Sequence, residues 1–348
     1  MPMPASLSLD CPRQAGRLLL TRARRIVDPE LRRCISGLPP GVRRPAEYHM
    51  GWQDERGHPG EAGGKALRPA LVFAAAAAVG GTAEMAMPAA VAVELVHNFT
   101  LLHDDVMDRD TMRHGRATAW KVFGTTNAVL AGNALQALAS HVLAEGPAEH
   151  LSMAQSALTT CEIELCEGQY QDCSFEQRTD VSLHECLSMA EGKTGSLLGS
   201  ACALGARYGG GTEAQARCFD RFGRAIGVAF QLLDDILGIW GDPAITGKPV
   251  YADLAARKKS LPVVAALRSG APCAHELAEL YSRPGRLSLS DLAHAARLID
   301  RCGGRSWSLE RATGQLHEAS GHLARSGVDP SAAGDLLALA DLTIRRSH

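Results

Sequence analysis

The stretch VELVHNFTLLHDDVMDRDTMRHGR, residues 93–116, places Asp104, Asp105 and Asp108 at the end of an apolar segment with helical spacing. On a helix Asp104 and Asp108 share a face because they are four residues apart, whereas Asp105 lies about 100° further around the axis. His97 precedes Asp104 by two turns and lies near the same face. Carboxylates one turn apart repel each other unless a cation lies between them. The stretch therefore predicts a helix that carries a cation site.

A second apolar stretch, FGRAIGVAFQLLDDILGIWGD at residues 222–242, carries Gln231, Asp234, Asp235 and Gly238 along one helical face. For either stretch alone, a solvated helix face with ordinary carboxylates is an equally good interpretation. Two such stretches, each flanked by apolar residues, favour bound metal, because burying unpaired carboxylates costs on the order of several kcal/mol. Mg²⁺ prefers oxygen ligands and is commonly shared with substrate phosphates. Both stretches therefore predict magnesium and a phosphate-bearing ligand.

The composition indicates a globular protein. The 348 residues are 46% hydrophobic and 21% charged with a net charge of −2, which excludes a disordered chain and a strongly basic nucleic-acid binder. The longest apolar run, residues 70–79, is shorter than the ~20 residues of a membrane span. Ten cysteines without a CxxC pair or zinc spacing, and no signal segment, predict reduced thiols and a cytoplasmic protein.

The hydrophobic pattern predicts an all-α fold. From Ala66 onward, segments rich in Ala, Leu and Val recur with 3.6-residue spacing and are separated by short Gly or Pro breaks. Sustained period-2 alternation is absent from the sequence, so we expect almost no sheet. The predicted organisation is a helix and loop-rich entry at residues 1–60, followed by one all-α domain at 61–348.

Lysine is scarce, and its positions are informative. Only six of the 36 basic residues are lysine, and a compact ammonium group is not equivalent to a guanidinium as a phosphate partner. Lys121 is expected to be an ordinary exposed side chain. The other five lie in segments marked by Gly, Thr or Pro, and with Arg68 and Arg113 they suit more than one diphosphate: Lys65, Lys193, Lys248, Lys258 and Lys259.

These segments together resemble the trans-isoprenyl diphosphate synthase (polyprenyl synthetase) family. The matching stretches run in order over residues 63–262: GGKALRP, LLHDDVMD, Arg113 before HG, EGKTG, FQLLDD, GKPVYAD and KKSLP. The resemblance implies a single-domain bundle of antiparallel helices around a deep central cavity, usually as a homodimer. It also implies magnesium-dependent condensation of isopentenyl diphosphate with an allylic diphosphate, without a protein nucleophile.

The resemblance also implies roles for individual residues. Asp104 and Asp108 would ligate Mg²⁺ on one side of the allylic diphosphate, and Asp234 would hold a third ion, with Asp105 and Asp235 in support. The allylic diphosphate would be bound, with Thr194 and Gln231 as polar lining, by Arg113, Lys193, Lys248 and Lys258. Isopentenyl diphosphate would be held without metal by Lys65, Arg68 and His97, with His114 close by. The residues that carry the chemistry would be Asp104, Asp105, Asp108, Asp234, Lys193 and Lys248.

Three positions depart from the family pattern. Gly238 stands where the second acidic motif usually has its last aspartate, which predicts weaker metal affinity on that side. His114 and Ala66 each replace an arginine of the family. A histidine that is neutral near pH 7 weakens a phosphate contact. The site for isopentenyl diphosphate is therefore expected to be less cationic than usual.

Product length is predicted from Phe99. It lies five residues before Asp104, about 7.5 Å along a helix, where bulk sets the cavity floor in the family. A single aromatic there, beside the small Thr100, resembles enzymes that stop at about C20, which is geranylgeranyl diphosphate. The alternative is that Phe99 is an ordinary core aromatic.

Two other functions remain open from the sequence. A class I terpene cyclase shares the fold and an aspartate-rich motif, but its Asn, Ser/Thr and Glu triad is absent from the second stretch. A non-catalytic subunit of a heteromeric synthase would be expected to lose the first motif, which here retains Asp104, Asp105, Asp108 and Arg113. Chain elongation is favoured over both.

Overall fold

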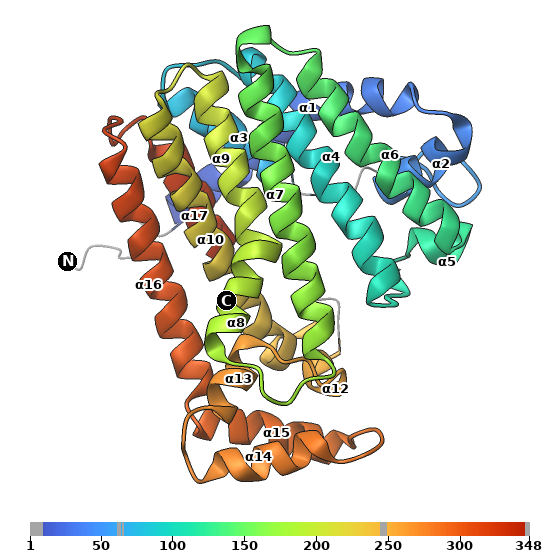
Figure 1. Cartoon of the computed structure of the whole chain (residues 1–348), viewed down its shortest axis with the longest axis vertical. Helices are drawn as coiled ribbons and strands as arrows, with labels where there is room; N and C mark the ends of the chain where they lie inside the picture. Colours follow the sequence, from blue (N-terminus) through green and yellow to red (C-terminus); the bar gives the residue numbers. More distant parts are fainter. Residues whose placement is uncertain (1–9, 61–63, 65, 244–248, 345–348) are drawn as a thin grey trace, which may run out of the picture. The chain divides into compact units, whose positions relative to one another are not determined.

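The computed structural model describes residues 10–60, 64, 66–243 and 249–344, and these are mostly helical (Figure 1). Within these residues, two short strands form an antiparallel hairpin: β1 (Met112–Arg113) and β2 (Arg116–Ala117), with Met112 opposite Ala117. The all-α expectation is confirmed. The chain folds as two compact units, and each is described by itself.

Unit 1 consists of Met1–Ile163, Leu197–Gly223 and Ser320–Leu342. Besides the hairpin, it contains α1 (Asp10–Ser36), α2 (Pro40–His49), α3 (Leu67–Ala78), α4 (Ala83–Met107), α5 (Ala119–Phe123) and α6 (Thr125–Ala144). It also includes nearly all of α9 (Ser196–Tyr208) and most of α17 (Gly334–Ile344). Only parts of three longer helices belong to it: α7 (Ala148–Phe175), α10 (Glu213–Trp240) and α16 (Gly304–Arg325).

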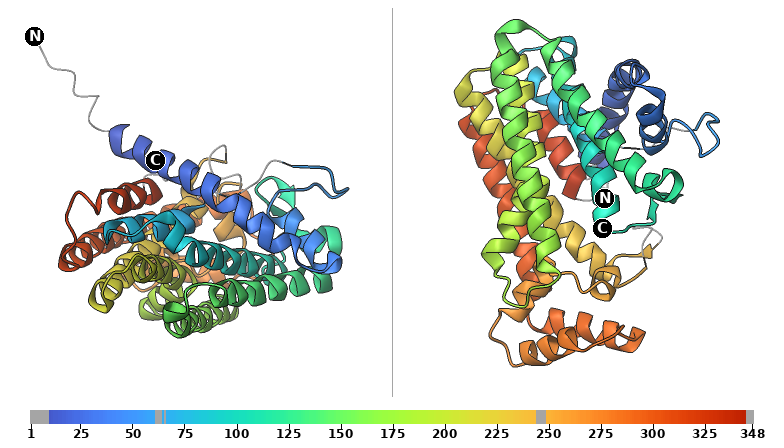
Figure 2. Two further views of the ribbon diagram at one scale, coloured as in Figure 1. Left: turned by 90° about the horizontal axis from the view of Figure 1, so that it is seen from above. Right: turned by 45° about the vertical axis from the view of Figure 1, so that its right-hand side comes forward.

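Helix α4 lies at the centre of unit 1, where it packs against α3 and α6 (Figure 2). Its middle, residues 89–96, is buried on every face because small alanines let neighbouring helices approach closely. Among the described residues, α4 is long and apolar enough to cross a membrane, but 67% of its most apolar window is buried inside the protein. That burial is typical of a core helix.

Both ends of α4 are fixed by local chemistry. The Thr82 hydroxyl accepts a hydrogen bond from the Met85 backbone N–H at the first turn, as an N-cap does. Asp108 is the C-cap, and the chain then turns back through the β1–β2 hairpin. The Asp110 carbonyl accepts hydrogen bonds from Thr118 Oγ1 at 2.8 Å and Trp120 Nε1 at 2.7 Å. This loop therefore returns Arg113 toward the end of α4.

Unit 2 consists of Glu164–Ser196, Arg224–Ala319 and Thr343–His348. It contains α8 (Leu183–Ala190), the π-helical turn η1 (Glu191–Gly195), α12 (Ala252–Ala255), α13 (Leu261–Leu267), α14 (Cys273–Ser282) and α15 (Leu289–Arg301). It also includes the C-terminal parts of α7 and α10 and most of α16.

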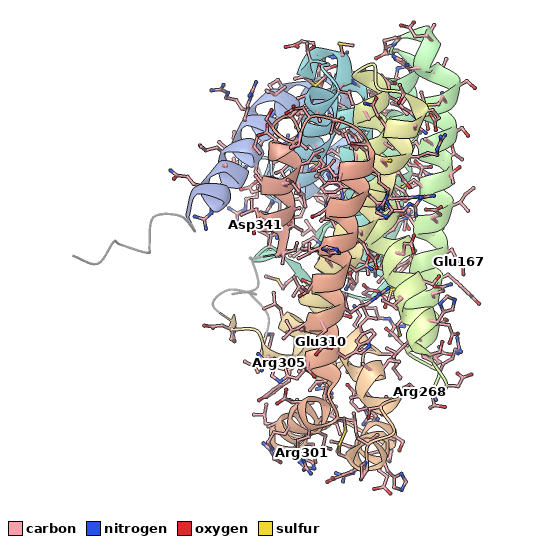
Figure 3. All side chains as sticks on the ribbon, turned by 90° about the vertical axis from the view of Figure 1, so that its left-hand side faces the viewer. Glu167, Arg268, Arg301, Arg305, Glu310 and Asp341 are labelled. Atoms are coloured by element: carbon pink, nitrogen blue, oxygen red, sulfur yellow. A yellow bond between two sulfur atoms is a disulfide. The ribbon has the colours of Figure 1, made fainter. Side chains whose placement is uncertain are left out.

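A hydrophobic core in unit 2 packs α8, α10 and α13 together around Met189, Leu232 and Val264. Helix α8 begins with a capping box, in which Ser182 and Glu185 satisfy each other's backbone N–H groups. On α16, Arg305 and Glu310 occupy exposed positions (Figure 3). The Arg305 guanidinium lies 5.2 Å from the centre of the Trp240 ring, which anchors α16 to the end of α10.

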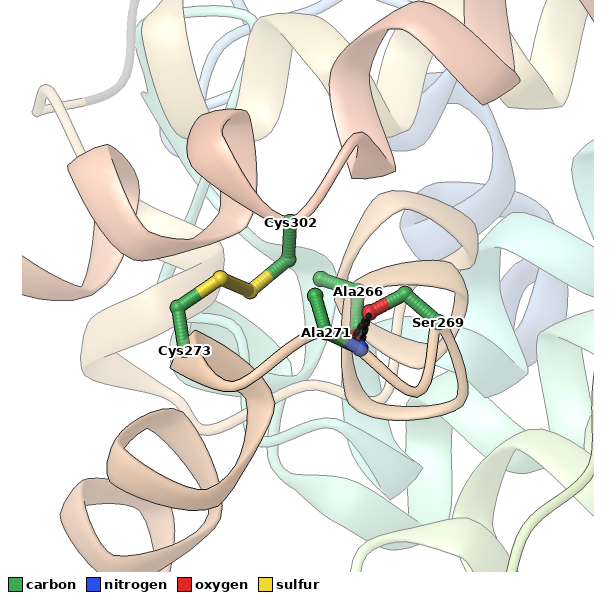
Figure 4. The surroundings of a disulfide bond; sticks show 5 residues. All are labelled: Ala266, Ser269, Ala271, Cys273 and Cys302. Carbon is green, nitrogen blue, oxygen red and sulfur yellow. Dashed lines mark hydrogen bonds between the residues drawn. A yellow bond between two sulfur atoms is a disulfide. The ribbon is translucent and has the colours of Figure 1, made fainter.

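A disulfide joins Cys273 and Cys302 (Figure 4). This pairing differs from the expectation that all cysteines are reduced. Cys273 is the first residue of α14 and Cys302 is the C-cap of α15, and the packing of these two helices brings their Cα atoms to 6.1 Å. The 29-residue separation matches no short cysteine motif, so the sequence carried no indication of the pair.

Candidate active site

The α4 half-site, formed by Asp104, Asp105, Asp108 and Arg113, lies at the C-terminal end of α4 in unit 1. Asp105 is buried, and its Oδ1 accepts a hydrogen bond from Arg113 Nε at 2.7 Å. Burial raises the pKa of Asp105 to about 6, although Arg113 acts in the opposite direction. Asp104 is half-buried and Asp108 is exposed. Asp105 thus holds Arg113, while its two neighbours in the motif remain accessible.

A histidine cluster, formed by His49, His97 and His114 together with Arg68, lies beside this half-site in unit 1. Burial and the positive charges of Arg68 and Arg113 lower the pKa of His97 well below its usual value. Burial raises the pKa of Glu94, which lies near Arg68 and accepts from the Asn98 amide. The sequence predicted Arg68, His97 and His114 as neighbours, and the structure brings them together. It adds His49, Asn98 and Glu94.

Phe99 is buried in α4, one turn before His103. The two rings meet edge to face with centroids 5.2 Å apart. His103 Nε2 lies 3.0 Å from the Val129 carbonyl oxygen of α6, and the ring occupies the space where a side chain at Gly132 would lie. A larger residue at 132 would displace His103, so glycine is required there. Phe99 is therefore braced by a ring that α6 holds in place.

The α10 half-site, formed by Lys193, Gln231, Asp234, Asp235 and Lys258, lies within unit 2. Lys193 sits in η1, and its Nζ pairs with Asp172 Oδ2 of α7 at 2.6 Å. A π-helical turn widens the helix locally and re-aims side chains, and such turns are frequent at functional sites. The EGKTG stretch thus forms a π-helical turn of its own between α8 and α9.

A chain of hydrogen bonds fixes the inner face of the α10 half-site. Thr194 Oγ1 donates to Gln231 Oε1 at 2.9 Å, and Gln231 Nε2 donates to Asp235 Oδ1 at 2.8 Å. Asp235 Oδ2 accepts from the Leu261 backbone N–H at 2.8 Å, at the start of α13. Asp235 is buried, which raises its pKa to about 7 against the effect of Lys258. Asp235 therefore holds Gln231 and the start of α13 in place, whereas Asp234, the preceding residue of α10, is exposed.

Lys258 is surrounded by carboxylates. Burial opposes its charge, but Asp172, Asp235, Asp253 and Asp234 together raise its pKa above the usual lysine value. Burial alone would raise the pKa of Asp172, yet Lys258 and Lys193 hold it below its usual value. Among the described residues, four carboxylates thus share two ammonium groups in this half-site, an excess of acidic side chains.

The position of the Asp253 carboxylate explains why residue 238 is a glycine. A side chain at position 238 of α10 would overlap the carboxylate of Asp253, which precedes Leu254 in α12. A carboxylate therefore occupies the space beside α10 where the family's last motif aspartate would project. The negative charge that the motif lacks at position 238 is thus supplied by Asp253 of α12.

The donor sets suit magnesium, although the described residues contain no group of three or more His, Cys, Asp or Glu already gathered as ligands. The α10 half-site has an excess of oxygen donors over cations, and one oxygen of buried Asp105 in the α4 half-site has no partner among the described residues. Both features favour a divalent cation that binds carboxylate oxygens. Mg²⁺ would be held by Asp104 and Asp108 in one unit and by Asp234 in the other.

The structure brings most predicted residues into two groups, one in each unit. Lys65 and Lys248 lie outside the described residues, and Lys121 is exposed as expected, with its ammonium 5.3 Å from the centre of the Trp120 ring. Sequence reasoning missed His49 and Asp172, which lie in ordinary helical contexts far from any motif. Asp253 ends the stretch GKPVYAD, which resembles the family, but the sequence alone gave this aspartate no role. Its place in that stretch was the signal that could have identified it.

Comparison with known proteins agrees with this arrangement. Residues 57–299 match the family model described as polyprenyl synthetase. The (2E,6E)-farnesyl diphosphate synthase of Mycobacterium tuberculosis is 44% identical over 343 residues, covering 97% of this chain and 96% of the relative. The geranylgeranyl diphosphate synthase of the same organism is also 44% identical, over 337 residues that cover 96% of this chain and 95% of the relative.

Solved structures give the same result. The polyprenyl synthetase of Streptomyces coelicolor superimposes with a TM-score of 0.90 at 44% identity and covers 94% of this chain and 99% of its own. A geranylgeranyl pyrophosphate synthase of Corynebacterium glutamicum, complexed with isoprenyl diphosphate and magnesium, gives a TM-score of 0.76 at 26% identity, covering 98% of this chain and 100% of its own. The chain belongs to the polyprenyl synthetase family, the magnesium-dependent trans-prenyltransferases that elongate prenyl chains.

Proposed function

We propose that the protein is a geranylgeranyl diphosphate synthase, which extends an allylic diphosphate with isopentenyl diphosphate and releases C20 geranylgeranyl diphosphate. The observation that supports this product length is the position of Phe99, about one turn before the aspartates of α4, where the ring of His103 packs against it. Relatives of equal identity are named farnesyl and geranylgeranyl synthases, so their names alone favour neither C15 nor C20.

The charges of the two half-sites suit ionisation of the allylic substrate. Three Mg²⁺ ions, ligated by Asp104, Asp108 and Asp234, would supply Lewis-acid stabilisation of the leaving diphosphate. Arg113, Lys193 and Lys248 would bind the same diphosphate, with Lys258 beside them. Asp105 and Asp172 orient two of these cations through short ion pairs. Preorganised cations stabilise charge as it develops, which lowers the barrier to breaking the C–O bond.

The new carbon–carbon bond requires no protein nucleophile. The allylic cation is attacked by the double bond of isopentenyl diphosphate, and a proton is then lost to the released diphosphate. Water must be excluded while the cation exists. The alanine, valine and leucine side chains of α3 and α4 are suited to forming an apolar wall above Phe99.

Product analysis tests the proposal. Purified protein is incubated with Mg²⁺, isopentenyl diphosphate and, in separate reactions, dimethylallyl, geranyl or farnesyl diphosphate, and the dephosphorylated products are sized by chromatography. A dominant C20 alcohol is expected. A dominant C15 alcohol would overturn the product length while leaving elongation intact. Hydrocarbon formed from geranylgeranyl diphosphate alone would indicate a cyclase instead.

Phe99→Ala tests the basis of the length assignment. Removing the ring opens space below the aspartates, so the variant is expected to release C25 and longer products. The control is Phe123→Ala, which removes an aromatic of unit 1 that packs on Tyr48 instead. An unchanged product distribution in Phe99→Ala would show that Phe99 is an ordinary core aromatic.

We also propose that the active form is a homodimer. Leu130 of α6 and Ile163 of α7 belong to unit 1 and leave large apolar side chains 48% and 66% exposed, which a second copy would cover. Tyr170 of α7, in unit 2, is 70% exposed. Light scattering coupled to size-exclusion chromatography is expected to give twice the mass of 36.9 kDa, and Ile163→Glu is expected to shift it toward the monomer.

A further inference from the structure

His49 occupies a position that no matched motif covers. It is the last residue of α2 and is half-buried, and the amide of Asn98 from α4 faces its ring. Asn98 is itself fixed, because its Nδ2 donates to the Glu94 carbonyl oxygen at 2.8 Å. Two helices distant in sequence thus orient one imidazole.

The groups around His49 and His97 are mostly cationic. Arg113, His114 and Arg116 face His49 from the hairpin, and His97 and Asn98 face it from α4. Two of the arginines are committed elsewhere: Arg113 to Asp105, and Arg116 to the carbonyl oxygens of Tyr48 and Gln53. Arg68 approaches His97 and is opposed by Glu94, but its buried Nε has no hydrogen-bond partner among the described residues.

Such surroundings favour the uncharged form of His49 and His97 in the protein without ligand. Burial, followed by Arg113, His114 and Arg116, lowers the pKa of His49 to about 3. An anion placed among these groups reverses the effect, because a nearby negative charge favours the protonated ring. The cluster is therefore arranged for an anionic ligand, whose charge favours protonation of His49 and His97 and so gives each of these rings a second donor.

We propose that His49 is an additional ligand of isopentenyl diphosphate, donating a ring N–H to its phosphate in place of the arginine charge lost at Ala66 and His114. The inference rests on the proposed function, since it assigns the substrate of the histidine cluster. Ala66 and His114 both lie at turns with positive φ, at 50° and 51°. His49 restores part of the lost arginine charge from α2.

Calorimetric titration of isopentenyl diphosphate into the metal-free, full-length protein tests the assignment. His49→Gln is expected to weaken binding about tenfold, the effect of losing one charge-assisted hydrogen bond. The KM of the allylic substrate is expected to be unchanged. The matched control is His275→Gln on α14, whose side chain is 84% exposed beside Glu279 and is expected to bind as the wild type does.

The pH profile separates ligation from a structural role. Because the bound ligand raises the pKa of His49, binding takes up a proton, and the dissociation constant is expected to rise from pH 6 to pH 8. The difference between wild type and His49→Gln at each pH cancels the ionisation of the ligand itself. His49→Arg, which carries a permanent charge, is expected to show a shallower pH dependence than wild type. His114→Arg is expected to recover most of the affinity in the His49→Gln background.

The outcomes distinguish the two proposals. Wild-type protein that neither binds isopentenyl diphosphate nor elongates a prenyl chain overturns the proposed function. Wild-type binding that is unchanged in His49→Gln, or a pH profile that is the same in both proteins, overturns the role of His49. If His49→Gln fails to fold, the profile of His49→Arg decides, because a purely structural histidine would leave the slope unaltered.

Discussion

The histidine cluster of unit 1 and the α10 half-site of unit 2 carry excess charge of opposite sign. The three histidines of the cluster are surrounded by Arg68, Arg113 and Arg116. In unit 2, Asp172, Asp234, Asp235 and Asp253 share Lys193 and Lys258. A region rich in cations is prepared to receive a diphosphate directly. A region rich in carboxylates is prepared to receive it only after a metal ion has arrived.

This difference assigns a separate task to each region. Isopentenyl diphosphate keeps its diphosphate during the reaction, so its site needs affinity without strong polarisation. The allylic diphosphate leaves as an anion, so its site needs charge that acts most strongly in the transition state. We therefore expect metal, lysine and carboxylate changes to affect the two substrates unequally.

Removing magnesium is expected to have the largest effect. Chelation should reduce the condensation rate by about a thousandfold or more, because Lewis-acid stabilisation of the leaving group is worth several kcal/mol. Binding of isopentenyl diphosphate, measured by calorimetry in the same buffer, should change little. If chelation abolished both, the histidine cluster and the α10 half-site would not differ as their charges indicate.

Lys258→Met is expected to have the next largest effect. It leaves four carboxylates with one ammonium group, and removing one partner of a partly buried ion pair costs about 3 kcal/mol of unfolding free energy. Urea unfolding measures the loss. Added Mg²⁺ should recover part of it, because a divalent cation replaces the missing charge.

Lys121→Met provides the control for that experiment. Lys121 is exposed on α5 and contacts only the ring of Trp120 among the interactions described for it. Its replacement should alter stability by less than about 0.5 kcal/mol. Equal losses in the two variants, or a loss in Lys258→Met that magnesium leaves unchanged, would contradict the charge assignment of the α10 half-site.

The sequence predicted the helices that carry Asp104 and Asp234 because apolar residues with 3.6-residue spacing surround both motifs. Pro243 also predicts that the second of these helices ends close to it, and α10 ends at Trp240. The partners of the motif residues were not predictable in the same way. Asp172 reaches Lys193, and His49 reaches Asn98, only after tertiary packing joins helices that are distant in sequence. The Cys273–Cys302 pair has the same origin.

Gly238 illustrates how a motif can mislead when its letters are interpreted alone. Its missing aspartate suggested a weaker metal site, but the space is filled by the carboxylate of Asp253. Gly238→Asp would restore the family's motif and is nevertheless expected to destabilise the protein by about 2 kcal/mol, because it overpacks the site and adds a like charge. Thermal unfolding in the absence of magnesium measures this effect.

The double variant Gly238→Asp with Asp253→Gly completes the test. It moves the carboxylate from α12 to α10 without changing the total charge, so it should recover most of the stability lost in Gly238→Asp. Magnesium affinity, followed by calorimetry with diphosphate present, should be similar in the double variant and the wild type. A gain in magnesium affinity from Gly238→Asp alone, with no loss of stability, would mean that Asp253 does not occupy that space. The introduced carboxylate and that of Asp253 would then contribute to magnesium binding independently. The negative charge of the α10 half-site would in that case be smaller than the carboxylates around Lys258 indicate.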